Sequence, residues 1–165
     1  RAIVLSVSPD GGAIEQLFEF RRLLEVDAAR LAALRATPEL ITQLRDILHR
    51  YTPNPDGQPN WASFAEVDDA IHRLISIGSG NSYLELMVAS VRGISQDVVV
   101  LIADHPGSID DAMRHHRQII DAIAVHDPEL AAREMDHHVR YTASVVQMQI
   151  DGSGHSPVEG GAAIE

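Results

Sequence analysis

Asp68 and His72 are the first of four residues whose types suit metal coordination. They stand four residues apart in the stretch Asp-Asp-Ala-Ile-His, so on a helix they lie on one face, one turn apart. That face is apolar, because Phe64 and Ile75 continue it at steps of four and three residues. A carboxylate and an imidazole that point into a core need a polar partner or a metal ion.

Two further histidines flank a predicted helical turn at His126 and Asp127. His116 lies ten residues before that turn and His138 eleven residues after it, so in an antiparallel pair both are level, roughly 15 Å from the turn. Their apolar faces contain Met113, Ile120 and Ile123 in one helix and Met135, Thr142 and Val145 in the other. Three inward imidazoles and one carboxylate could hold one divalent metal. We take zinc first, with nickel, iron or manganese as alternatives.

The same residues allow a simpler interpretation. A single inward histidine is more often a core residue satisfied by a neighbour, and an Asp-x-x-x-His pair alone can be a buried ion pair. His115 and His137 lie about 100° further round their helices. We expect them to face solvent or to lie beside the ligands. The other histidines are expected at the surface: His49, His105, His126 and His155.

Composition excludes several classes of protein. The 165 residues suit one domain with its own core. The absence of cysteine excludes disulfides and thiolate metal sites, which fits a cytoplasmic protein. A formal net charge of −11 argues against direct binding of nucleic acid by this segment. We find no signal peptide and no uncharged apolar run of about 18 residues, so we expect no membrane span.

Hydrophobic spacing and turn residues predict an all-α, antiparallel bundle of six helices, or seven. Helices are expected at about residues 13–35, 38–51, 61–77, 82–103, 108–125 and 128–150. Thr37, Ser108 and Asp127 are the expected N-caps, and a glycine in Gly78–Asn81 is available to end the third helix. The first helix should bury Leu17, Phe20, Leu24, Ala28 and Leu31. The fourth has the apolar stripe Leu84, Met87, Val91, Ile94, Val98 and Leu101, which could serve either the bundle core or a dimer interface.

Several local motifs follow one another at the spacing of a known family. They are Glu19–Glu25, Ala28–Ala33, Asp68-x-x-x-His72-Arg73, Gly80-Asn81-x-x-Leu84, His116-Arg117-x-Ile119 and His138. Together they resemble the FCD domain, the C-terminal effector-binding domain of FadR-type regulators in the GntR family of bacterial transcription regulators. The resemblance covers roughly residues 17–146.

The resemblance implies an all-helical bundle that forms a homodimer and binds a metabolite at its centre. It also implies that Asp68, His72, His116 and His138 bind a divalent metal, which helps to hold a small carboxylate effector. Arg21 matches an arginine of the family that is a candidate for binding this carboxylate. Two weaker candidates are Arg92, within an otherwise apolar helix, and Asn81. A surface or ion-paired role would also explain the arginines, and helix capping would explain Asn81.

The family's regulators bind DNA through an N-terminal winged helix-turn-helix domain, which this sequence lacks. We therefore expect residues 1–12, whose pattern predicts a short strand or extended arm, to be a linker or a remnant of that domain, and any DNA contact to need the missing part. Residues 13–150 would form the effector-binding and dimerisation domain, and residues 151–165 a disordered tail.

The predicted function is a metal-assisted metabolite sensor without catalytic activity. Two alternatives stay open. One is a metalloenzyme acting on a small organic acid, with Glu85 or Glu134 as its base. The other is a structural dimerisation module whose polar core residues pair only with one another.

Overall fold

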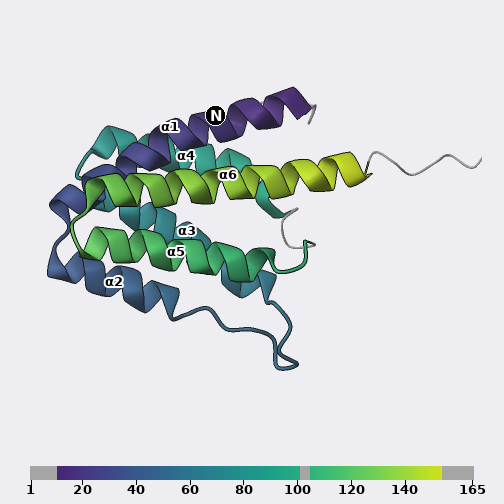
Figure 1. The fold of residues 1–165 in the computed structure, drawn as a ribbon, viewed down its shortest axis with the longest axis horizontal. Helices are drawn as coiled ribbons and strands as arrows, with labels where there is room; N and C mark the ends of the chain where they lie inside the picture. Colours follow the sequence, from purple (N-terminus) through teal and green to yellow (C-terminus); the bar gives the residue numbers. More distant parts are fainter. Residues whose placement is uncertain (1–10, 101–104, 154–165) are drawn as a thin grey trace, which may run out of the picture.

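The computed structural model describes residues 11–100 and 105–153. Within these ranges the chain forms six α-helices and no strand, which confirms the predicted all-α class (Figure 1). The helices are α1 (Gly11–Arg35), α2 (Pro38–Leu48), α3 (Trp61–Gly78), α4 (Ser82–Val99), α5 (Ser108–Ala124) and α6 (Pro128–Ser153). The arm predicted at residues 1–12 and the tail predicted at residues 151–165 lie mostly outside the described residues, in 1–10 and 154–165. Where the structure does describe them, both predictions are wrong, because residues 11–12 belong to α1 and residues 151–153 to α6.

Capping residues set several helix ends as the sequence predicts. Thr37 Oγ1 accepts a hydrogen bond from the Leu40 amide at 3.2 Å, with Pro38 as the first residue of α2. Asp127 Oδ1 accepts one from the Leu130 amide at 2.9 Å at the start of α6. Gly80, with φ +62°, follows α3 in the left-handed conformation that favours glycine.

The predicted cap at Ser108 is wrong. Gly107 is the N-cap of α5, and Ser108 is already the first helical residue. Gly107 has φ +78°, a left-handed backbone conformation that a serine would adopt only with strain. The helix therefore begins where the backbone can turn, one residue before the expected side-chain cap.

α3 runs through the middle of the bundle. It packs against α1, α2, α4 and α5, and α1 and α6 lie side by side (Figure 1). α5 and α6 form a hairpin about the turn at His126 and Asp127, with the two helices antiparallel. Any polar side chain on the inner faces of α3, α5 and α6 is consequently enclosed on several sides.

The buried face of α1 differs from the predicted apolar stripe. Phe20 is 42% exposed, and the helix buries Phe18, Arg21 and Glu25 ahead of its alanine-rich second half, in which Ala28 is buried as predicted. The prediction followed apolar residues alone, whereas the first half of α1 turns an arginine and a glutamate inward. The predicted stripe therefore differs from the buried face in that half of the helix.

The apolar stripe of α4 is only partly in the core of this chain. Val91 is buried, whereas Met87 and Ile94 are 40% and 46% exposed. The buried face also carries Arg92 and Ser95. The side chain of Val98 and the whole of Leu101 lie outside the described residues. Use of the exposed part of the stripe in a dimer interface therefore stays a prediction.

Among the described residues, no helix combines the length and the apolar character that crossing a membrane requires.

Candidate metal centre

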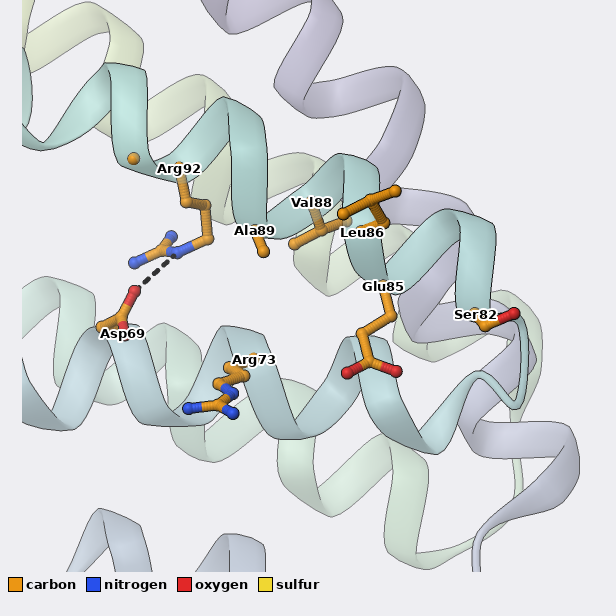
Figure 2. Close-up of a pocket in the computed structure, with 9 residues that line it drawn as sticks. Asp69, Arg73, Ser82, Glu85, Leu86, Val88, Ala89 and Arg92 are labelled. Atoms are coloured by element: carbon orange, nitrogen blue, oxygen red, sulfur yellow. Dashed lines mark ion pairs between the residues drawn. The ribbon is translucent and has the colours of Figure 1, made fainter. Parts of the chain in front are cut away.

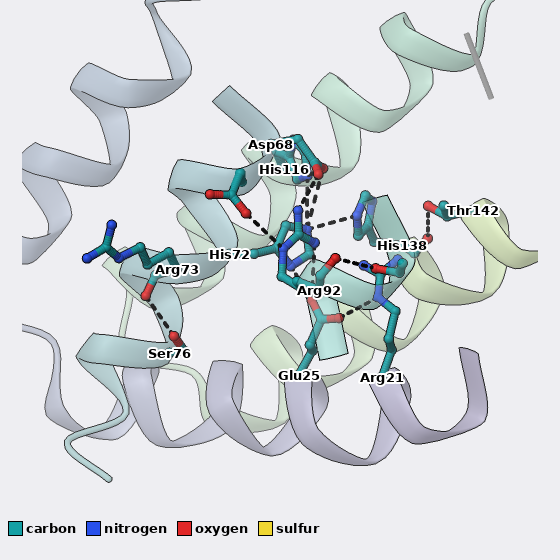
Figure 3. A network of polar contacts seen from close by, with 12 residues as sticks. Arg21, Glu25, Asp68, His72, Arg73, Ser76, Arg92, His116, His138 and Thr142 are labelled. Carbon is teal, nitrogen blue, oxygen red and sulfur yellow. Dashed lines mark hydrogen bonds and ion pairs between the residues drawn. The ribbon is translucent and has the colours of Figure 1, made fainter. Parts of the chain in front are cut away.

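Four side chains from three helices converge in the bundle interior. Asp68 and His72 come from α3, His116 from α5 and His138 from α6, and one potential ligand atom of each lies within 4.8 Å of all the others (Figure 3). His72 Nε2 is 3.1 Å from His138 Nε2 and 3.4 Å from His116 Nε2. Asp68 Oδ1 is 3.2 Å from His116 Nε2 and 3.7 Å from His72 Nε2. The convergence predicted from helical spacing is thus present.

The local sequence explains why these side chains point inward. On α3, Phe64 and Ile75 are buried on the same face as Asp68 and His72. On α5 and α6 the predicted apolar neighbours are buried as well, and His116 and His138 are only 0% and 2% exposed. The apolar residues of each stripe drive its face into the core, and the polar members are carried inward with them.

Hydrogen bonding among the histidines cannot satisfy all of them. His72 Nδ1 lies against the Glu25 carboxylate, so in the neutral ring the proton is on Nδ1 and Nε2 keeps a single lone pair. Two imidazole nitrogens approach that lone pair, and it can accept a hydrogen bond from only one of them. The Nδ1 atoms of His116 and His138 are also buried without a hydrogen-bond partner. A cation shared by the three Nε2 atoms would remove this conflict.

The separations of these atoms suit a metal ion. Zinc–nitrogen bonds of about 2.0–2.1 Å in tetrahedral geometry put ligand atoms about 3.3 Å apart. Four of the separations among Asp68, His72, His116 and His138 are 3.1 to 3.7 Å, and all four ligand atoms lie within 4.8 Å of one another. The residues present therefore fit a divalent metal with imidazole and carboxylate ligands.

Glu25 is a residue of this cluster that the sequence interpretation missed. Its side chain is 1% exposed, and its two oxygens contact His72 Nδ1 and Arg21 Nε, the latter at 2.7 Å. A carboxylate on the far nitrogen of a histidine fixes the ring's tautomer and orientation. The only sequence signal was the i, i+4 spacing of Arg21 and Glu25, which is equally common on exposed helix faces.

Arg92 connects the cluster to neighbouring acids. Its Nη2 donates to Asp68 Oδ2 at 2.5 Å, its Nη1 lies 3.7 Å from Glu25 Oε2, and its Nε lies 3.6 Å from Asp69 Oδ1. The side chain is 7% exposed. It also lines a pocket of about 540 Å³ between α3 and α4, where Arg73 and Glu85 are further wall residues (Figure 2). Arg92 thus separates this pocket from the cluster.

The other two predicted effector residues differ in position. Arg21 is 1% exposed, stacks over Phe18 and has a buried Nη1 without a hydrogen-bond partner. Asn81 is exposed, and its Oδ1 accepts hydrogen bonds from the amides of Tyr83 and Leu84 at the start of α4. Among the described residues, no hydrogen bond or ion pair joins Asn81 to the cluster, so the structure brings Arg21 and Arg92 to it and leaves Asn81 at the surface.

The acids of the cluster are ionised. Burial alone would raise the pKa of Glu25, but Arg21, His72 and Arg92 outweigh it and hold this pKa well below the usual range. Burial likewise opposes ionisation of Asp68, yet Arg92 and His116 keep its pKa well below normal. Burial disfavours the Arg92 cation too, but the carboxylates of Asp68 and Glu25 raise its pKa overall. The site is therefore a set of buried opposite charges.

His72 and His138 are neutral and available as ligands near pH 7. Burial, followed by repulsion from Arg92, lowers the pKa of His72 to about 4. Burial and the neighbouring His116 and His72 rings lower the pKa of His138 well below the usual value. Neutral imidazole is the form that binds metal.

The remaining histidines follow the prediction with one refinement. His137, His49 and His126 are exposed and His105 is half-buried, whereas His155 lies outside the described residues. His115 is 2% exposed and lies beside the cluster, with its ring centroid 6.0 Å from that of His138. Glu85 and Glu134 are the candidate bases of the enzyme alternative. Glu85 lines the pocket between α3 and α4, Glu134 is half-buried on α6, and neither belongs to the group of potential metal ligands.

Comparison with known proteins adds a family and several relatives. Residues 16–141 match the FCD domain. The repressor NanR of Escherichia coli (strain K12) is 30% identical over 137 residues, which are 78% of this chain and 48% of NanR. The regulator YcbG of Bacillus subtilis (strain 168) is 22% identical over 155 residues, 91% of this chain and 60% of YcbG.

A third relative matches a shorter segment. A probable D-xylose utilization operon transcriptional repressor of Paenarthrobacter nicotinovorans is 34% identical over 76 residues, 46% of this chain and 33% of the relative. All three are transcriptional regulators by name, and the chain spans between a third and three fifths of their lengths.

Proposed function

This chain belongs to the FCD domain family, and from that premise we propose that it is the ligand-sensing and dimerisation domain of a bacterial transcriptional regulator. The family and the relatives identify a regulatory domain rather than an enzyme. The observation that carries the proposal is the convergence of one carboxylate and three imidazoles from α3, α5 and α6 on a common point.

Asp68, His72, His116 and His138 are the proposed ligands of one divalent metal. Imidazole and carboxylate together suit zinc first, with nickel, iron and manganese as alternatives. Glu25 holds His72 in the tautomer that presents Nε2 to the site, and Arg92 holds Asp68 through its second oxygen. When bound, the metal supplies a Lewis-acidic centre that attracts an anionic oxygen.

The charge balance of the core supports an anionic effector. In the described part of the chain, the buried Arg, Asp and Glu residues are Arg21, Arg92, Glu25 and Asp68, two cations and two anions. These charges cancel, so a divalent ion adds two uncompensated positive charges to a buried site. A small carboxylate metabolite offsets them. Arg21 Nη1 and Arg92 Nε, both buried without a hydrogen-bond partner, are donors that it could use.

Effector binding would alter how two copies of the domain sit together, and with them the DNA-binding parts of the regulator. The matched segments make up between a third and three fifths of the relatives, and two of the relatives carry the description HTH-type. DNA binding is accordingly assigned to a domain outside this sequence. The net charge of −11 supports this assignment, because an acidic domain repels the phosphates of DNA.

Metal analysis of purified protein tests the metal site. We expect one equivalent per chain in the wild type, and its loss in both His72→Ala and His116→Ala, because the two helices share one ion. His49→Ala, which alters an exposed histidine, should retain the metal. Full metal content in either core variant with an intact helical spectrum would refute a shared site.

Thermal unfolding with a panel of small carboxylic acids tests the effector. An acid that binds the folded domain raises its Tm. The rise should be larger for metal-loaded than for chelator-treated protein, and Arg21→Gln should reduce it. No shift from any acid in a broad panel, in either form of the protein, would contradict the sensing function.

A further inference from the structure

A second pair of histidines lies between the same two helices. α5 carries His115 directly before His116, and α6 carries His137 directly before His138. The rings of His115 and His137 have their centroids 4.5 Å apart. Ring pairs of the central cluster are separated by 4.6 to 5.3 Å. We call His115 and His137 the outer pair. Their rings are as close together as the rings of His72, His116 and His138, the proposed ligands of the central site.

His115 has an unmet bonding requirement. Its side chain is 2% exposed, yet its Nδ1 is buried without a hydrogen-bond partner. An unsatisfied buried polar atom is destabilising, so such atoms commonly have a ligand, a water or a catalytic use. His137 is exposed and lines a groove of about 510 Å³ between α1 and α6. The pair is thus enclosed at one end and open to solvent at the other.

We propose that His115 and His137 form a second site for a divalent transition metal, with water completing the coordination. Imidazole ligands select zinc, nickel or copper over magnesium and calcium, which prefer oxygen. The site is separate from the central cluster: neither histidine belongs to that group of ligands, and the ring centroids of His115 and His138 are 6.0 Å apart.

The surroundings position His115 as the surroundings of the central site position His72. Asp111 stands four residues before His115, as Asp68 stands before His72. Tyr141 packs edge-on against His115, with centroids 5.0 Å apart, and its hydroxyl donates to Asp111 Oδ2 at 3.0 Å. These contacts restrict the His115 ring and place a carboxylate one helical turn away.

Nearby charges limit the strength of the outer site. Arg114 pairs with Asp111, and Arg133 and Arg140 line the groove with His137. Asp136 lines it too but is paired with Arg22 and Arg140. With two protein ligands and these cations close by, the outer site should bind metal more weakly than the four-ligand centre and should exchange it freely.

Calorimetric titration of the full chain with Ni²⁺ or Zn²⁺ tests the proposal. We expect a second, weaker binding event after metal has filled the central site. In His137→Ala this binding event should weaken by at least about tenfold, and His137→Asp should restore part of it because aspartate can still bind metal. His49→Ala is the matched control, since it removes an exposed histidine elsewhere and should leave the second binding event unchanged.

A spectroscopic measurement separates the two sites. Cu²⁺ added to His72→Ala, whose central site is disabled, should give an electron paramagnetic resonance spectrum with coupling to two imidazole nitrogens, lost when His137→Ala is added. Equal affinity and stoichiometry in wild type and His137→Ala would overturn the outer site. In His116→Ala, loss of the stronger binding event alone would report on the central site and leave the outer site intact. Failure of one proposal can therefore be told from failure of the other.

Discussion

Glu25 is not one of the four proposed metal ligands, yet the candidate metal centre depends on it. It is buried and holds His72 through Nδ1 while it binds Arg21. Its carboxylate therefore sets the tautomer of one proposed ligand and neutralises one buried cation. Metal affinity and core stability should both respond to this single side chain.

Glu25→Gln should lower metal affinity by about 10–100-fold, because an amide orients His72 less strongly than a carboxylate does. Competition against a chromophoric chelator measures the change. Glu19→Gln, an exposed substitution on the same helix, is the control and should bind as the wild type does. Equal affinity in Glu25→Gln would mean that His72 is oriented without Glu25.

Acid should destabilise the metal-free domain before its carboxylates titrate. The pKa values of His72 and His115 are lowered from 6.5 to about 4, in both cases first by burial. The unfolded chain therefore binds more protons than the folded one between these values, and stability falls as the pH falls from 6.5 towards 4. Each histidine contributes a slope of about 1.4 kcal/mol per pH unit.

Urea unfolding at several pH values, with a chelator present, measures this slope. The lowered pKa values of Glu25 and Asp68 act in the same direction at still lower pH, because these acids must be protonated against their ion pairs. Constant stability between pH 6.5 and 5 would show that the buried histidines accept protons without unfolding.

At the scale of the helix, α1 offers two phenylalanines with opposite environments. Phe18 is 4% exposed and packs in the core, whereas Phe20 is 42% exposed. Phe18→Ala should cost about 3–5 kcal/mol of unfolding free energy, and Phe20→Ala less than about 1 kcal/mol. Denaturant unfolding of the two variants measures both. Similar losses of unfolding free energy in the two variants would mean that Phe20 lies on the buried face of α1, as the apolar spacing predicted.

The sequence predicts the elements well because their signals are local. Thr37 and Asp127 cap their helices through contacts three residues along the chain. The inward positions of His116 and His138 follow from apolar neighbours on their own helices. The contacts of Glu25 with His72 and of Arg92 with Asp68 could not be predicted in the same way. They join different helices, so spacing within one helix does not predict them, and the pairings depend on how α1 and α4 pack against α3.

At the scale of the whole molecule, the proposed metal joins α3, α5 and α6, so its removal should affect global unfolding. Metal that binds the folded state more tightly than the unfolded one raises stability by mass action, about 2.7 kcal/mol at a hundredfold excess over Kd. Chelation should consequently lower the Tm of the wild type, while leaving that of His72→Ala nearly unchanged. A Tm that does not respond to chelation in the wild type would argue against a metal bridging these helices.

The cancellation of charge among Arg21, Arg92, Glu25 and Asp68 has a consequence for how a regulator could use this domain. A core that is already neutral can stay folded when the ion is scarce, but it then lacks the excess positive charge that would favour an anion. Under the proposed function, the domain would respond only when two conditions coincide in the cell, enough metal and enough metabolite. A shortage of either the metal or the metabolite would leave the domain without its bound effector.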